Sequence, residues 1–256
     1  MSNREEGRPV SGIRLALING SWQSLANLYY LVVRSIFVVV FAGMIGVEHY
    51  GYYVYAQYWY VLVLPAATGG MNELVMAEYA RAVPERRAEL IGTGLNLRLI
   101  LSTIVTVSVM VGASLFEPDA MLRLLIIIYA QGVLTNGITN WFSALFVARE
   151  KSHYVFYLSA PLLTLEVMLV VFAAYRGVDL LTIALLQCGM WWFTLLVGYL
   201  VYRHQFEPIR LRFSRKYNRF FLRNGALLAL AAFVFSCFGP GLLIFYRYLI
   251  AVSYTH

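Results

Sequence analysis

Charged residues are scarce in this sequence. Asp, Glu, Lys and Arg make up 13% of the 256 residues, whereas soluble domains carry about 25%. Hydrophobic residues make up 61%, and the mean hydropathy is +0.68. The few charges cluster between apolar runs of about 20 residues or more, the length that a helix needs to cross the hydrocarbon core of a bilayer. The composition excludes an ordinary soluble domain and predicts a polytopic membrane protein.

Two charged residue types are almost missing, and this excludes several chemistries. Asp occurs only as Asp119 and Asp179, so the sequence lacks a cluster of Asp residues that would hold Mg²⁺. Lys occurs only as Lys151 and Lys216, and neither lies in the Gly-rich Walker A pattern that binds ATP. We therefore expect no catalytic residues, no metal site and no cofactor, and we do not expect an enzyme.

The apolar runs are continuous rather than short and alternating. Because lipid offers the backbone no hydrogen-bond partner, a crossing segment must be a helix or part of a closed barrel, and continuous runs favour the helix. We predict an all-α membrane fold with seven crossings, at residues 17–42, 51–75, 90–115, 121–147, 154–174, 179–202 and 225–250.

Positive charges are divided unevenly between alternate connections. One side has fifteen Lys and Arg residues, and the other has Arg123 and Arg176. Because cytoplasmic loops are enriched in Lys and Arg, the asymmetry predicts a multi-pass protein with a cytoplasmic N-terminus. Anionic lipid headgroups on that side suit these charges. The lipid bilayer is therefore the expected partner, and the net charge of +7 needs no nucleic acid to explain it.

The most basic segment separates the sixth and seventh predicted crossings. It favours an interfacial linker over an RNA-binding patch, and it divides the chain into a six-helix bundle at 1–202, a basic cytoplasmic linker at 203–224 and a seventh helix at 225–256. A short similarity between residues 17–26 and 222–231 indicates a duplicated half, with chance matching as the alternative. If the repeat is real, the seventh helix starts a second, truncated bundle.

Polar residues follow one face of the first predicted helix. Their spacings of four, four, three and four place them together, at Asn19, Gln23, Asn27, Tyr30 and Arg34. An Arg in the bilayer interior faces a bundle interior, a partner or water. The stripe therefore lines a substrate cavity or, alternatively, holds helices together by polar contacts.

Two other helices carry polar faces. The fourth helix has a wide one that includes Gln131, Thr135, Asn136 and Asn140. On the third helix Arg98, Ser102 and Thr106 share one face at spacings of four. Arg98 either faces the same cavity or extends toward the headgroups.

Three further features concern the later helices. Glu166 lies at a depth close to that of Arg34, so the two are a candidate ion pair or coupling site. Gln187 shares a face with aromatic and small residues, which is typical of packing. Gly239-Pro-Gly241 is expected to break or kink the seventh helix.

Several segments resemble one membrane-protein family. They are Asn19-Gly20 with Arg34, the turn Ile45-Gly-Val-Glu-His-Tyr-Gly51 before Tyr52 and Tyr53, the segment Gly69 to Arg81, and Ala148-Arg-Glu-Lys151. Their order resembles polysaccharide-biosynthesis flippases, of the O-antigen type, in the multidrug/oligosaccharidyl-lipid/polysaccharide exporter superfamily. Such proteins have two helical bundles, so the resemblance implies a C-terminally truncated chain.

The resemblance implies a transport function. The expected role is alternating-access transport of a polyprenyl-diphosphate-linked oligosaccharide across the bacterial inner membrane, for surface polysaccharide and lipopolysaccharide biosynthesis. The lipid-linked oligosaccharide is the expected substrate, and a polysaccharide polymerase and assembly proteins are expected partners. The alternatives are a multidrug cation antiporter of the same superfamily and a non-transporting scaffold of an envelope-assembly complex. Arg rather than acidic residues in the predicted cavity favours the flippase.

Overall fold

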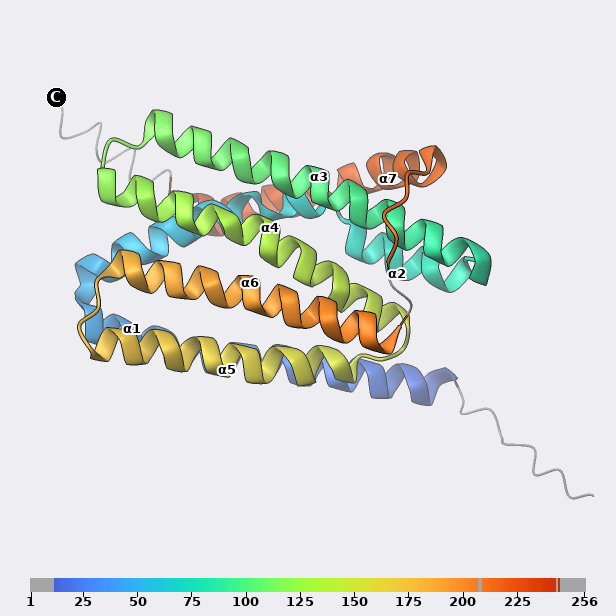
Figure 1. Cartoon of the computed structure of the whole chain (residues 1–256), viewed down its shortest axis with the longest axis horizontal. Helices are drawn as coiled ribbons and strands as arrows, with labels where there is room; N and C mark the ends of the chain where they lie inside the picture. Colours follow the sequence, from blue (N-terminus) through green and yellow to red (C-terminus); the bar gives the residue numbers. More distant parts are fainter. Residues whose placement is uncertain (1–11, 207–208, 243, 245–256) are drawn as a thin grey trace, which may run out of the picture.

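The computed structural model describes residues 12–206, 209–242 and 244. Within them the chain forms helices and no strand, and six helices are long and apolar enough to cross a membrane. The predicted all-α polytopic membrane fold is confirmed, and Figure 1 shows the helices packed side by side along one direction. The end of the last predicted crossing and the extreme N-terminus lie outside the described residues.

The first helix is a hairpin. Helix α1 (Gly12–Thr68) has 57 residues, and a straight helix of that length would extend about 86 Å, far beyond the roughly 30 Å of hydrocarbon. Its backbone leaves helical geometry at Gly46, where φ is 79°. The ring of Phe41 lies 4.9 Å from that of Tyr53, so the two arms run antiparallel (Figure 1). The first two predicted crossings are these arms, separated by one residue instead of a loop.

The second arm ends earlier than the sequence suggested. The predicted crossing at 51–75 stops at Thr68, because Gly69 and Gly70 adopt the left-handed conformation with φ near 60°. Glycine adopts this conformation without the steric penalty of a Cβ. The chain then forms a short separate helix, α2 (Met71–Arg81).

The next four helices agree with the predicted crossings to within a few residues, except at the start of the third. They are α3 (Pro84–Phe116), α4 (Ala120–Ala148), α5 (His153–Tyr175) and α6 (Leu180–Gln205). Helix α3 begins six residues before the predicted start, with Pro84 in its first turn, where no intrahelical N–H is needed. Asp119 and Asp179 cap α4 and α6 by accepting hydrogen bonds from backbone N–H groups.

Helix α7 (Arg215–Ser236) begins ten residues before the predicted start at 225, so half of the expected linker is helical. Tyr217, Phe221 and Gly225 are buried at a spacing of four, while the basic residues between them are exposed. This face packs against the bend between α1 and α2, because the backbone of Gly225 lies directly on the Gly69 carbonyl.

A π-helical turn, Cys237–Gly241, follows α7 and coincides with the predicted kink at Gly239-Pro-Gly241. Proline cannot donate the backbone hydrogen bond of a regular helix, which is a common cause of such irregularities.

The buried side chains form two clusters along the bundle. The turn-side cluster lies beside the α1 reversal and includes Phe37, Phe41, Tyr53, Leu122, Leu125, Tyr129 and Val170. The linker-side cluster lies toward the segment before α7 and includes Met71, Leu90, Trp141, Phe146, Tyr202 and Phe221. Helix α4 contributes to both and contacts α1, α3 and α6, so it is the central helix of the bundle.

Candidate functional site

An ion pair joins α1 to α5 inside the bundle. The Arg34 Nη2 atom donates to Glu166 Oε1 over 2.8 Å. The Arg34 side chain is 23% exposed and that of Glu166 is 7% exposed. Arg34 lies twelve residues, about 18 Å, before the Gly46 reversal, so the pair is within the membrane-spanning part of the hairpin. A charge placed there requires a partner, and each residue supplies one for the other.

A chain of hydrogen bonds extends from Glu166 across the bundle. Gln187 on α6 donates its amide N–H to the Glu166 carboxylate over 2.8 Å. The Gln187 carbonyl oxygen in turn accepts from Gln57, in the second arm of α1, and from the Tyr129 hydroxyl on α4, each over 3.0 Å. Arg34 and Gln187 donate directly to the carboxylate and stabilise its negative charge, and Gln57 and Tyr129 support it indirectly by holding Gln187. Both arms of α1 are thereby joined to α4, α5 and α6 in one network around Glu166 and Gln187.

The hairpin of α1 explains how this network forms. Its reversal brings Arg34 in the first arm and Gln57 in the second arm to the same neighbourhood, although 23 residues separate them. A second polar contact links the first arm to α5, where the hydroxyls of Tyr29 and Thr164 pair. Residues on the first arm therefore reach α5 through both an ion pair and a neutral hydrogen bond.

Arg98 occupies a different environment. Its side chain is fully buried between α2, α3 and α4, where Nη1 donates to Asn72 Oδ1 over 2.8 Å. Its guanidinium lies 5.8 Å from the ring centroid of Trp141. The other two nitrogens, Nε and Nη2, have no hydrogen-bond partner among the described residues. Of the two alternatives for Arg98, this geometry disfavours extension toward the headgroups, because the side chain is enclosed by protein.

The other predicted cavity residues are dispersed. Asn19 accepts a hydrogen bond from the Ser152 backbone, and Tyr30 lies beside Arg34 with 54% of its surface exposed. Gln23 is half-buried, and Asn27 is exposed on the same helix.

On α4, Gln131 accepts from the Trp192 indole N–H, and Thr135 donates to the Gln131 carbonyl. Asn136 is half-buried with its amide nitrogen unpaired among the described residues, and Asn140 is exposed. The structure thus brings Tyr30 and Arg34 together with Glu166. Arg98 contacts a different set of residues, which includes Asn72 and Trp141.

Sequence reasoning missed half of the network. It interpreted the Gln187 face as packing, and it did not select Gln57, Tyr129 or Asn72. Gln57, Tyr129 and Gln187 are polar side chains within apolar runs, so helical periodicity alone carried no signal for them, whereas Asn72 lies beside Glu73 in the short helix α2. The available signal was the cost of an unpaired amide in a membrane-spanning helix, which demands a partner from another helix.

The described residues thus define a multi-pass helical membrane protein with charged and amide side chains at its centre. The chain belongs to the polysaccharide biosynthesis protein family, whose model matches residues 16–250. No curated protein matches the sequence. Among solved structures, it is similar to a MOP superfamily transporter from Pyrococcus furiosus, with 17% identity and a TM-score of 0.49. That match covers 85% of this chain and 50% of the transporter, so the chain spans about half of the transporter's length.

Proposed function

We propose that the protein is a flippase that moves a polyprenyl-diphosphate-linked oligosaccharide across the bacterial inner membrane. The observation that carries this proposal is a partly exposed arginine, Arg34, within the membrane-spanning part of a protein of the polysaccharide biosynthesis family. The product would enter surface polysaccharide of the O-antigen type, and a polymerase and assembly proteins are the proposed partners. The distribution of Lys and Arg supports a cytoplasmic N-terminus.

Arg34 has the chemistry to recognise the diphosphate. A guanidinium presents a planar fork of donors that matches two phosphate oxygens. Its exposed fraction of 23% leaves it reachable, and the exposed side chains of Tyr30 and Asn27 continue the same face of α1. These groups are suited to sugar hydroxyls and to the diphosphate.

The Glu166 carboxylate would compete with a diphosphate for the Arg34 guanidinium. The Glu166 carboxylate occupies the Arg34 Nη2 donor in the structure, and Gln187 holds that carboxylate in place. An incoming diphosphate must therefore displace the carboxylate from Arg34 or bind beside it. In an alternating-access cycle this exchange would link substrate binding to the contact between α1 and α5.

A multidrug cation antiporter is the second candidate. It would require a carboxylate free to bind a cation. Glu166 is the buried carboxylate in the bundle centre, and Arg34 already serves as its counter-ion. The geometry therefore favours an anionic substrate over a cationic one.

The test is a binding measurement that separates the two candidates. The purified chain in nanodiscs would be titrated with a short polyprenyl-diphosphate sugar and, separately, with tetraphenylphosphonium as a lipophilic cation. We expect binding of the diphosphate, with about tenfold weaker affinity in Arg34→Ala and an intermediate loss in Arg34→Lys. Glu166→Gln keeps a side chain that bonds Gln187 but removes the competing charge, so it should bind the diphosphate more tightly.

Opposite effects of the two substitutions are the decisive outcome, because general misfolding would weaken binding in both. Asn140→Ala changes an exposed residue on α4, away from the Arg34–Glu166 pair, and serves for comparison because it is not required to follow either direction. Binding of the cation but not of the diphosphate, lost in Glu166→Gln, would replace the flippase proposal with the antiporter. Unchanged diphosphate binding in Arg34→Ala would make Arg34 a structural residue.

A further inference from the structure

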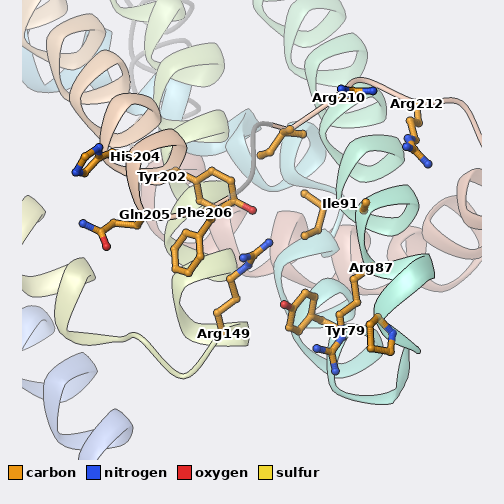
Figure 2. A pocket seen from close by; sticks show the side chains of 13 residues that line it. Tyr79, Arg87, Ile91, Arg149, Tyr202, His204, Gln205, Phe206, Arg210 and Arg212 are labelled. Atoms are coloured by element: carbon orange, nitrogen blue, oxygen red, sulfur yellow. The ribbon is translucent and has the colours of Figure 1, made fainter.

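A basic pocket lies at the end of the bundle where the described linker meets the helices. Its volume is about 920 Å³, and five segments contribute to it: the end of α2, the start of α3, the ends of α4 and α6, and the linker before α7. Figure 2 shows the lining side chains gathered around this space. Four of the thirteen described lining residues are arginines and none is a carboxylate, namely Arg87, Arg149, Arg210 and Arg212.

Arg149 is held in place by aromatic rings. The guanidinium carbon lies 4.3 Å from the ring centroid of Phe206, 5.4 Å from that of Tyr202 and 5.7 Å from that of Tyr79. Its Nε atom is buried and has no hydrogen-bond partner among the described residues. In Figure 2 the side chain extends past Phe206 toward the space bounded by Ile91 and Arg87. Packing of this kind fixes the direction of the guanidinium without using its donors.

The other arginines approach from the opposite wall. Arg87 lies 4.6 Å from the Tyr79 ring, and its Nε donates to the Ala82 carbonyl, so its outer nitrogens remain for another acceptor. Arg210 and Arg212 are exposed on the linker, which crosses α3 where Gly92 leaves no side chain in its way. The linker is therefore seated against α3, and its arginines are brought to the pocket.

Helix ends account for only part of this arrangement. Arg149 and His204 lie at the ends of α4 and α6, where positive charge stabilises the helix dipole. This effect does not explain why the pocket is open or why four arginines converge there. Within the described part of the chain, the single ion pair closer than 4.0 Å is Arg34 with Glu166, so none of the four has a carboxylate partner at that distance.

We propose that this pocket binds a phosphate-bearing group at the membrane surface. Arginine is the side chain best suited to phosphate oxygens, because its fork forms two charge-assisted hydrogen bonds to one group. The volume accommodates a diphosphate or the headgroup of an anionic phospholipid. The site is separate from Arg34, and the proposal does not rest on the transport function.

The first experiment uses inorganic pyrophosphate as the soluble probe. The purified full chain, in detergent, is titrated and binding is measured by equilibrium filtration. We expect saturable binding by the wild type, with at least tenfold weaker affinity in the double variant Arg87→Gln/Arg149→Gln. The matched control, Arg123→Gln/Arg176→Gln, removes two arginines from the opposite end of the bundle and should bind within twofold of the wild type.

The second experiment identifies the source of the phosphate. Native mass spectrometry of the same proteins compares retention of phosphatidylglycerol with that of phosphatidylcholine. If the natural ligand is a lipid headgroup, the wild type and the control retain more phosphatidylglycerol than the pocket variant does. If it is a soluble compound, pyrophosphate binding depends on the pocket while phosphatidylglycerol retention is equal in all three proteins.

A second variant guards against misfolding, because Arg149 packs on three rings. Arg210→Gln/Arg212→Gln changes only exposed linker residues and should weaken binding of the preferred probe at least threefold, with elution from gel filtration like that of the wild type. The proposal is overturned if the wild type binds neither probe. It is equally overturned if binding is the same in the wild type, both pocket variants and the control.

Discussion

The turn-side and linker-side halves of the bundle each contain an arginine between the helices, but they accommodate it differently. In the turn-side half, Arg34 has a carboxylate partner, Glu166, which is supported by Gln187. In the linker-side half, Arg98 has one neutral partner, Asn72, and a nearby indole ring. The first arrangement neutralises the charge, and the second encloses it.

The difference shows two ways in which a membrane-spanning helix carries a charge. An ion pair inside protein offsets desolvation better when further hydrogen bonds support it. Gln187 donates to Glu166 and is itself held by Gln57 and Tyr129, while one buried nitrogen of Arg34, Nε, has no partner among the described residues. Arg98 lacks a carboxylate within 4.0 Å among the described residues, and two of its nitrogens are unpaired. We therefore expect Arg34 to contribute to stability and Arg98 to reduce it.

Breaking the Arg34 pair gives the largest expected effect. Arg34→Ala leaves Glu166 buried without its counter-ion and should cost about 3 kcal/mol of unfolding free energy. Glu166→Ala leaves Arg34 unpaired but partly exposed and should cost somewhat less. The double variant should cost less than the sum, with a coupling of about 1–3 kcal/mol. Reversible unfolding in mixed detergent micelles measures all four proteins. Additive effects would show that the contact contributes nothing to stability.

The Arg98 site allows the reverse experiment. Arg98→Met keeps an unbranched side chain and removes the unpaired charge, so it should leave the unfolding free energy unchanged or raise it by about 1 kcal/mol. Asn72→Ala removes the one hydrogen-bond partner and should lower it by about 2 kcal/mol. The same unfolding assay applies to both. A large loss in Arg98→Met would mean that the buried guanidinium is stabilising, which contradicts the contrast with Arg34.

Close backbone packing is a second property of the linker-side half. A Cβ at Gly225 would overlap the Gly69 carbonyl, so Gly225→Ala should destabilise the packing of α7 by about 1–3 kcal/mol. Gly112→Ala adds the same methyl where nothing lies within 4 Å and is the matched control. Limited proteolysis between α6 and α7 should accelerate in the first variant alone. Equal proteolysis rates would show that α7 is not held by this contact.

The smallest expected effect concerns the cap of α6 in the turn-side half. Hydrogen bonds from the Thr182 backbone and hydroxyl hold the pKa of Asp179 below its ordinary value of 3.8. Because the folded pKa is lowered, the stabilisation is present above pH 3.8 and is lost as the pH falls through the lower folded value. Asp179→Asn should remove this loss, seen as a flatter pH dependence of the melting temperature below pH 4. An identical pH profile in both proteins would exclude the effect.

The sequence predicted the helices well where apolar runs ended in helix-breaking residues. The crossings at 121–147 and 154–174 lie within α4 and α5, and the crossing at 179–202 begins one residue before α6. The connections between these helices contain charged residues, which mark the ends of the apolar runs. The start of α7 was missed because basic residues lower the mean hydropathy of the segment, although Tyr217 and Phe221 are spaced by four and share its buried face.

The candidate site was predicted less completely than the fold. Equal depth in two helices suggested Arg34 and Glu166 as partners, and the structure places them in contact. Depth cannot determine rotation about a helix axis, so the sequence did not reveal that Asn140 is exposed or that Arg98 is turned toward Asn72. Which polar residues meet depends on how the helices pack, and packing is a property of all the side chains at an interface.

The single-residue reversal at Gly46 has a consequence for how the two ends of the bundle differ. At the turn-side end the described connections are Gly46, residues 117–119 and residues 176–179, which leaves little chain outside the helices. A reporter peptide inserted at Gly46 would interrupt the α1 hairpin, and the other two connections offer only three and four residues, whereas the segment at 209–214 accepts one between α6 and α7. Antibodies and proteases should therefore find far fewer attachment points at the Gly46 end of the bundle than at the end with the basic pocket.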